Sequence, residues 1–206
     1  GQNCILIEGG ANRCVTVNDV EIAISELGLV AGDYLLLQNE TSSVKEIIAL
    51  ASERGLKVVF NPAPMDKTIQ AIDLSLIALL VVNEVEGAEL VAADADAPYE
   101  QILSMLRQKY PATNILLTLG SRGSVYSGVD GKTHFEPAQK VEAVDTTAAG
   151  DAFTAALTLE YLRSGDMLSA CDFANAAGSI TVSRPGASSS IPNEKEVAEF
   201  LALNKE

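Results

Sequence analysis

Residues 145–153, DTTAAGDAF, place three small residues directly before a segment with helical character. Because Ala148, Ala149 and Gly150 have little or no side chain, the backbone there can approach a ligand closely. The helix that follows would direct its unpaired N–H groups and the positive end of its dipole toward the same point. This arrangement predicts an anion site, to which the dipole contributes about 0.3–2 kcal/mol. The alternative is an ordinary helix start with small-residue packing, in which Asp151 of the first turn serves as a cap.

Three further groups of polar residues follow predicted strands. Residues 118–123, TLGSRG, end a strand in a Gly-x-x-Gly turn, although any tight turn before a hairpin has this form. Asn83 and Glu86 follow another strand with a spacing that is also typical of a helix cap. Glu40 follows a third strand and is either a carboxylate in a cleft or a solvated loop residue. Since open α/β sheets bind ligands at the carboxyl ends of their strands, we expect the chemistry at these positions.

The elements that position these residues alternate between strands and helices. Short, almost continuously apolar runs are typical of strands buried on both faces, and they lie at residues 4–7, 34–37, 58–60, 76–82 and 115–119. Ser43 and Glu46 have the spacing of a capping box and predict a helix toward Arg54. Further predicted elements are a helix at 99–109, a hairpin of 124–127 with 132–135, and helices at 151–163, 167–182 and from Asn193. The alternation predicts one α/β domain over 1–206, with a doubly wound, mostly parallel sheet and helices on both faces.

Composition and charge exclude several classes of function. The 206 residues carry a formal net charge of −14, with 14 Lys and Arg against 28 Asp and Glu. A nucleic acid or an anionic membrane surface requires a cationic footprint, and the scattered basic residues form none. No apolar run approaches the ~20 residues of a membrane span, and the first residues lack the pattern of a secretion signal. We therefore expect a cytoplasmic protein with no nucleic acid and no membrane as partner.

Metal and dinucleotide motifs are missing from the sequence. The cysteines Cys4, Cys14 and Cys171 are widely separated, and with the single His134 they are too few for a structural zinc site. They are expected to be buried free thiols in a reducing cytoplasm. Neither a GxxxxGK[ST] loop nor a GxGxxG turn occurs, which argues against a P-loop kinase and a dinucleotide-binding domain.

The run DTTAAGDAF resembles the carboxyl-side signature of the ribokinase-like carbohydrate kinase family. Further segments resemble family elements in family order from about residue 1 to the end, namely GAN at 10–12, LLQNE at 36–40, NPAP at 61–64, NEVE at 83–86 and TLGSRG at 118–123. Val82 departs from the pattern, which often has proline there. The family's upstream third, with its glycine-rich sugar motif, part of the sheet and the lid strands, has no counterpart here.

The resemblance implies transfer of the γ-phosphoryl group of ATP to a primary hydroxyl of a small sugar, D-ribose first. Asp151 would be the general base, and the amides of Ala148, Ala149 and Gly150 would stabilise the charge on the transferred group. ATP would be bound by Asn83, Thr118, Gly120, Ser121, Arg122, Gly123, Gly150 and Asn175, although an asparagine within a helix is usually a surface residue.

The resemblance also implies sugar contacts and two metal ions. Glu40 and Asp151 would contact the sugar, and Glu86 would act through water on Mg²⁺. The activating K⁺ would be bound by Asp145, Thr147, Arg184, Gly186 and Ser190, although loops rich in Ser and Gly need no ion to explain them. The NPAP turn would be architectural, and the full-length form would be a homodimer.

Two alternatives to a ribose kinase stay open at this point. The first is a kinase of the same family for fructose, a nucleoside or another small alcohol such as a hydroxymethylpyrimidine. The second is a catalytically inactive nucleotide-binding or assembly module, whose missing strands would leave an apolar face that pairs with another copy.

Overall fold

The computed structural model describes residues 8–204 and contains two compact units, with the division after Leu80 in strand β3 (Leu79–Asn83). Cys4 and the predicted strand at residues 4–7 lie outside the described residues. Of the other two cysteines expected to be buried, Cys171 is buried, whereas Cys14 is exposed. The assignment of 1–206 to one domain stays a prediction. None of the helices in the described part of the chain is long and apolar enough to cross a membrane.

The first unit consists of two parallel strands and the start of a third, with helices alongside. Its elements are η1 (Gly10–Cys14), α1 (Val17–Glu26), β1 (Tyr34–Gln38), α2 (Val44–Glu53), β2 (Lys57–Asn61), η2 (Lys67–Ala71) and η3 (Leu74–Leu76). Tyr34 pairs with Lys57, and Val59 pairs with Leu79. The apolar side chains of β2 and the inner face of α2 are fully buried, as in Phe60, Ile47 and Ile48. The strands predicted at 34–37 and 58–60 are thereby confirmed.

Two local predictions in this unit are wrong. Ser43 does not form a capping box with Glu46, because its backbone is left-handed (φ 62°) and its hydroxyl donates instead to the carbonyl of Val15 at 3.4 Å. The strand predicted from residue 76 begins only at Leu79. Asp73 accepts hydrogen bonds from the amide and hydroxyl of Ser75, which winds residues 74–76 into a 3₁₀ turn.

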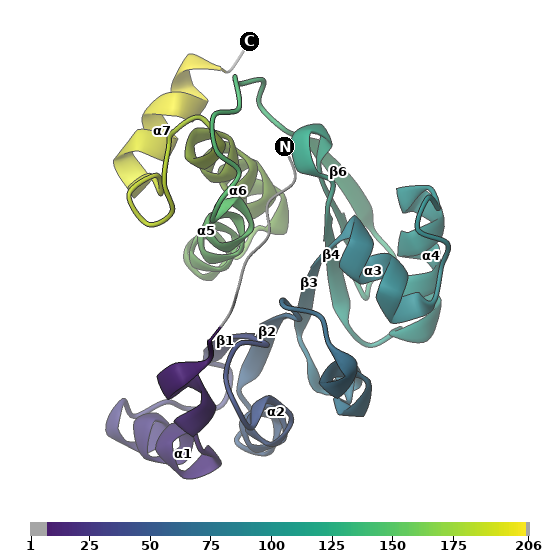
Figure 1. The fold of residues 1–206 in the computed structure, drawn as a ribbon, viewed down its shortest axis with the longest axis vertical. Helices are drawn as coiled ribbons and strands as arrows, with labels where there is room; N and C mark the ends of the chain where they lie inside the picture. The colour runs from purple at the N-terminus through teal and green to yellow at the C-terminus, as the bar shows by residue number, and fades with distance from the viewer. Residues whose placement is uncertain (1–7, 205–206) are drawn as a thin grey trace. The chain divides into compact units, whose positions relative to one another are not determined.

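The second unit contains the remaining strands and most of the helices. Its elements are α3 (Glu84–Val91), α4 (Tyr99–Lys109), β4 (Asn114–Thr118), η4 (Gly120–Arg122), β5 (Gly123–Ser127), β6 (Thr133–Pro137), α5 (Ala149–Ser164), α6 (Met167–Val182) and α7 (Glu194–Leu203). The predicted hairpin is confirmed, since β5 pairs antiparallel with β6, and β4 pairs antiparallel with β5. Helices α3 and α4 lie on one face of these strands and α6 on the other (Figure 1). Strand directions are mixed, since the pairs β1–β2 and β2–β3 are parallel and the pairs β4–β5 and β5–β6 are antiparallel.

Glycine at position 87 allows α3 to lie close to its neighbours. A Cβ atom there would stand 3.0 Å from Cγ2 of Ile102 on α4 and 3.2 Å from Cδ1 of Leu117 on β4. Both of these side chains are buried in a close-packed layer. The start of α3, which carries Asn83 and Glu86, is therefore fixed by tight packing one turn further on.

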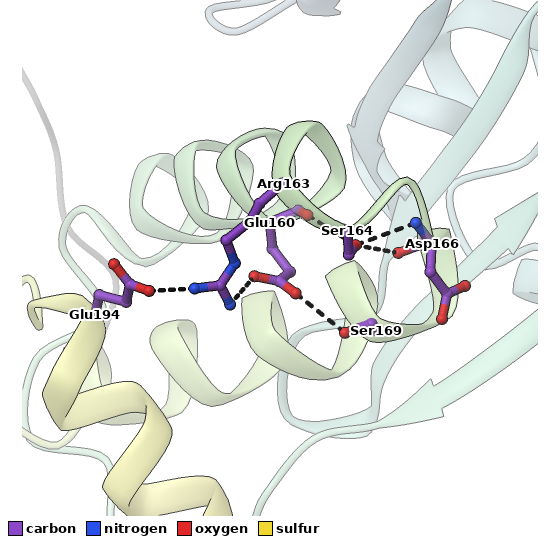
Figure 2. A network of polar contacts seen from close by, with 6 residues as sticks. All are labelled: Glu160, Arg163, Ser164, Asp166, Ser169 and Glu194. Carbon is purple, nitrogen blue, oxygen red and sulfur yellow. Dashed lines mark hydrogen bonds and ion pairs between the residues drawn. The ribbon is translucent and has the colours of Figure 1, made fainter.

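A polar network joins α5, α6 and α7 (Figure 2). Glu160 of α5, with a side chain only 8% exposed, forms an ion pair with Arg163 and accepts a hydrogen bond from Ser169 Oγ of α6 at 3.2 Å. Arg163 also forms an ion pair with Glu194 at the start of α7, and its guanidinium lies 5.9 Å from the ring centroid of Phe173. Because a buried carboxylate is costly without partners, these contacts fix the arrangement of the three helices.

Candidate functional site

A pocket of about 420 Å³ lies in the second unit, between the η4 turn, residues 138–146 and helices α5 and α6. Its volume is in the range of small-molecule sites. The pocket brings together seven residues singled out from the sequence, Thr118, Gly120, Ser121, Gly123, Ala149, Gly150 and Asn175. Arg122, Asn83, Ala148 and Asp151 are not among its lining residues.

Much of the pocket wall was not predicted. Residues 138–141, Ala143 and the α6 residues Gly178, Ser179 and Val182 line it, together with Thr146 and Phe153. The only signal for 138–143 is its place in the chain, between the hairpin and the small-residue helix start. Ser179 Oγ donates to the carbonyl of Gln139 at 3.3 Å, which fastens this irregular segment to α6.

The η4 turn depends on its two glycines. Gly120 and Gly123 have φ values of 57° and 115°, which side chains rarely adopt. At Gly123 a Cβ atom would stand only 2.0 Å from the carbonyl oxygen of Glu136 on β6. The amide of Leu119 donates to the carbonyl of Gly123 at 2.8 Å and closes the turn. The segment is thus both a tight turn before a hairpin and a wall of the pocket.

Asn175 is a buried residue of α6, only 5% exposed, which excludes the alternative of a surface asparagine. Its Nδ2 donates to Ser124 Oγ at 3.2 Å and to the carbonyl of Glu136 at 3.0 Å. One amide group therefore connects α6 with both strands of the hairpin at the pocket wall.

Helix α5 begins at Ala149, two residues before the predicted start. Ala148 is the N-cap residue with φ 62°, an uncommon conformation for alanine that costs about 1–3 kcal/mol. The amides at positions 149–151 belong to the first turn, which offers them no intrahelical carbonyl, and that of Ala149 donates instead to the carbonyl of Thr146 at 3.4 Å. Asp151 is the third residue of the helix and is exposed, so it is not the N-cap. The helix start that the sequence predicts as an anion site faces the pocket through Ala149 and Gly150.

Of the loop residues expected to bind a monovalent cation, Thr147 and Gly186 are hydrogen-bonded to Asp145. Its Oδ1 accepts from the amide of Thr147 and its Oδ2 from the amide of Gly186, both at 3.0 Å. Ser190 is buried and its hydroxyl donates to the carbonyl of Ala187 at 2.6 Å, while Arg184 forms an ion pair with Glu196 at 2.7 Å. A carboxylate, a hydroxyl and loop carbonyls are the oxygen ligands that a hard cation prefers, so the chemistry of this loop fits a hard cation.

The hydrogen bonds around Asp145 have a consequence for acid stability. Those from Thr147 and Gly186 hold the pKa of the carboxyl below its ordinary value of 3.8. A lowered pKa in the folded state means that the stabilisation is present above that value and is lost as the pH falls through the folded-state pKa. We therefore expect Asp145→Asn to lower the thermal unfolding midpoint most near neutral pH, with the difference from the parent shrinking below about pH 4. Thermal unfolding followed by circular dichroism measures this, with the exposed Asp96→Asn as control, and a difference independent of pH would contradict it.

Asn83 and Glu86 form the helix cap that was the alternative to a ligand site. Asn83 Oδ1 accepts from the amide of Glu86, and Glu86 Oε2 accepts from the amide of Asn83, both at 2.9 Å. Among residues 8–204, no three His, Cys, Asp or Glu side chains are grouped so as to hold a metal ion. A single carboxylate nevertheless fits Mg²⁺, because this ion keeps several waters and is held by one or two carboxylates together with substrate phosphates.

Glu40 lies in the first unit, where it is exposed after β1. The residues before it are fastened to the NPAP turn. Gln38 Nε2 donates to Asn61 Oδ1 at 3.0 Å, and Asn39 donates through its amide to the carbonyl of Ala63 at 2.9 Å and through Nδ2 to that of Pro64 at 2.8 Å. The turn thus has the architectural role expected of it.

Comparison with known proteins, by sequence and by structure, finds carbohydrate kinases each time. The family model described as pfkB family carbohydrate kinase matches residues 1–194. The chain is 37% identical over 203 residues to a ribokinase of Staphylococcus aureus (96% of this chain, 65% of the relative), and 31% identical over 208 residues to a deoxyribokinase of Salmonella typhi (98% and 66%). The structure of Arabidopsis thaliana ribokinase complexed with ribose and ATP superimposes with a TM-score of 0.81 at 28% identity (98% and 65%). The chain thus spans about two thirds of the length of these relatives, and the predicted α/β fold class is confirmed.

Proposed function

Because the chain belongs to the pfkB family of carbohydrate kinases, we propose that it transfers the γ-phosphoryl group of ATP to a primary hydroxyl of a small sugar. The observation that carries the proposal is the pocket in which the η4 turn and the start of α5 meet. Glycine-rich backbone on one side and a helix N-terminus on the other are suited to a phosphorylated ligand. Asn175 and the segment 138–143 supply the rest of a wall large enough for a nucleoside.

Asp151 is the proposed general base. It stands in the first turn of α5, where its carboxylate is exposed and held on a rigid element. The sugar hydroxyl gives its proton to Asp151 while its oxygen forms a bond to the γ-phosphorus, and the bond from that phosphorus to the ADP oxygen breaks. The amides of Ala148, Ala149 and Gly150 are proposed to stabilise the negative charge on the transferred group.

Two ions would support this reaction. Mg²⁺ would neutralise charge on the phosphates, with Asn83 near them and Glu86 oriented toward its water shell. K⁺ would be held by the loop of Asp145, Thr147 and residues 184–190. In both cases the protein side chains described above are already ordered by hydrogen bonds within the chain.

D-Ribose is the proposed substrate, and Glu40 the proposed sugar contact. The relatives include ribokinases and a deoxyribokinase, which differ in whether the sugar carries a 2-hydroxyl. A site built to bond a hydroxyl rejects the analogue that lacks it by a large factor, whereas a site that does not bond it accepts both. The rates with ribose and with deoxyribose therefore show whether the site binds the 2-hydroxyl and so requires ribose.

The test is sugar-dependent ADP release by the chain with MgATP and K⁺. We expect release with D-ribose, accompanied by formation of a ribose phosphate, and a lower rate with 2-deoxyribose and fructose. A higher rate with another sugar would reassign the substrate within the family. Nucleotide binding measured by calorimetry without any turnover would instead favour the inactive nucleotide-binding module, and absence of both would contradict the proposal.

A further inference from the structure

Arg122 belongs to the η4 turn but does not line the pocket that its neighbours Ser121 and Gly123 line. Its guanidinium contacts residues at the starts of α3 and α4 instead. It forms an ion pair with the carboxylate of Glu84, and it lies 5.4 Å from the ring centroid of Tyr99. The side chain of the turn is therefore anchored by the first residues of α3 and α4.

Glu84 is well placed to act as an anchor because the start of α3 is itself fixed. The reciprocal hydrogen bonds of Asn83 and Glu86 cap the helix on either side of Glu84. Gly87 then packs against Ile102 of α4. The carboxylate of Glu84 consequently projects from a rigid helix start.

The backbone of the turn is closed by hydrogen bonds from the amide of Leu119 to the carbonyl of Gly123 and from the amide of Arg122 to the carbonyl of Leu119. Glycines at 120 and 123 flank Ser121 and Arg122, and glycine gives the backbone access to many conformations. The backbone on its far side is held by the amide of Ala138, which donates to the carbonyl of Arg122 at 3.3 Å. The contact with Glu84 is the corresponding side-chain restraint. Since the two side chains are 52% and 37% exposed, their pair adds little to global stability, and its effect is local.

We propose that Glu84 is a positioning residue for the nucleotide: by holding Arg122, it sets the Gly120–Gly123 turn in the geometry that binds phosphate. The inference rests on the proposed function, because it assumes that the pocket binds a nucleotide. Glu84, which follows Asn83 directly, thereby links the start of α3 to the η4 turn. Glu84 acts only through Arg122 and does not touch the ligand.

Whether Glu84→Gln weakens or strengthens ADP binding distinguishes a positioning role of Glu84 from a purely electrostatic one. Glu84→Gln removes a negative charge near the phosphates, which by electrostatics alone would strengthen ADP binding. If the carboxylate positions the turn, the same change weakens binding. We expect Glu84→Gln to raise the Kd for ADP about three- to tenfold, within the range for groups coupled by direct contact. Glu89→Gln makes the same charge change at an exposed position of α3 and is the matched control, with little effect expected.

The experiment is calorimetric titration with ADP in the presence of EDTA, on the parent chain, both single variants, Arg122→Gln and the double variant Glu84→Gln/Arg122→Gln. In the Arg122→Gln background, Glu84→Gln should have no further effect, because its partner is gone. The exchanged pair Glu84→Arg/Arg122→Glu should recover part of the lost affinity. Unfolding midpoints are measured alongside and should not change.

Unchanged or tighter ADP binding by Glu84→Gln would overturn the inference, as would an equal loss with and without Arg122. These outcomes leave the proposed function intact, because the parent still binds ADP. Failure of the parent chain to bind ADP would contradict the proposed function and the inference with it.

Discussion

Asp151→Asn is expected to lower sugar-dependent ADP release by at least about 10²-fold while leaving the Kd for ADP nearly unchanged. Asparagine has the shape of aspartate but cannot take the proton of the attacking hydroxyl, and loss of a general base costs about 10²–10⁴ in rate, or roughly 3–5 kcal/mol of barrier. Asp151 is exposed at the third position of α5, so the fold should tolerate the change. The measurement is coupled ADP release with saturating MgATP and D-ribose, beside calorimetric ADP binding.

The control for this variant is Asp96→Asn, an exposed aspartate outside the pocket, which removes the same charge. It should retain the parent rate. A loss of less than tenfold in Asp151→Asn, with ADP binding preserved, would show that Asp151 is not the base. An equal loss of ADP binding and rate would place Asp151 in nucleotide binding instead.

Gly123→Ala is expected to have the largest effect on stability. The new Cβ atom would stand 2.0 Å from the carbonyl oxygen of Glu136, 2.6 Å from the amide nitrogen of Ala138 and 2.8 Å from the carbonyl carbon of Pro137. All three are backbone atoms, so β6 would have to move away from β5. Backbone strain at φ 115° adds to the clash. Together the two effects should lower the free energy of unfolding by about 2–6 kcal/mol.

Gly131→Ala is a close control for the clash. Gly131 also has a positive φ, 80°, but nothing lies within 4 Å of its would-be Cβ atom. It should cost only the strain of a left-handed residue, about 1–2 kcal/mol. Urea unfolding measures both variants, and equal destabilisation would contradict the role assigned to the carbonyl of Glu136. Because Gly123 lines the pocket, its variant should also lose ADP affinity, whereas Gly131→Ala should not.

Elements with a buried apolar face could be predicted from the sequence. Strands β1, β2 and β4 and helices α4 and α6 occupy nearly the predicted residues, because burial on the sheet or between helices imposes a periodic pattern. Helix α1 was missed, since Ile24 is its only buried residue and its apolar face is weak. The Thr16 and Asp19 capping box, in which Asp19 accepts from the amide of Thr16 at 2.9 Å, was the available signal for it.

Details decided by tertiary contacts could not be predicted. The hydroxyl of Ser43 has two possible partners, the helix amide or a distant carbonyl, and only the fold brings Val15 within reach. Likewise, Asn175 was placed in the pocket by resemblance, but its burial depends on the hairpin that its amide contacts. Residues 138–141 and Ala143 line the pocket without a motif, because backbone that passes a ligand needs no particular side chain. Local motifs could thus identify the turn and the helix start, whereas the rest of the wall required the three-dimensional arrangement.

The two hydrogen bonds of Asn175 make one side of the pocket, formed by α6 and the hairpin, more rigid than the side formed by residues 138–143. Since one amide is bonded to β5 and to β6, helix α6 cannot slide along the hairpin without breaking both bonds at once. Residues 138–143 follow β6 without forming a helix or strand, and backbone outside regular elements yields at lower energy. We therefore expect a wider ligand to displace residues 138–143, at the cost of the hydrogen bond from Ser179 Oγ to the carbonyl of Gln139, while α6 and the hairpin keep their spacing.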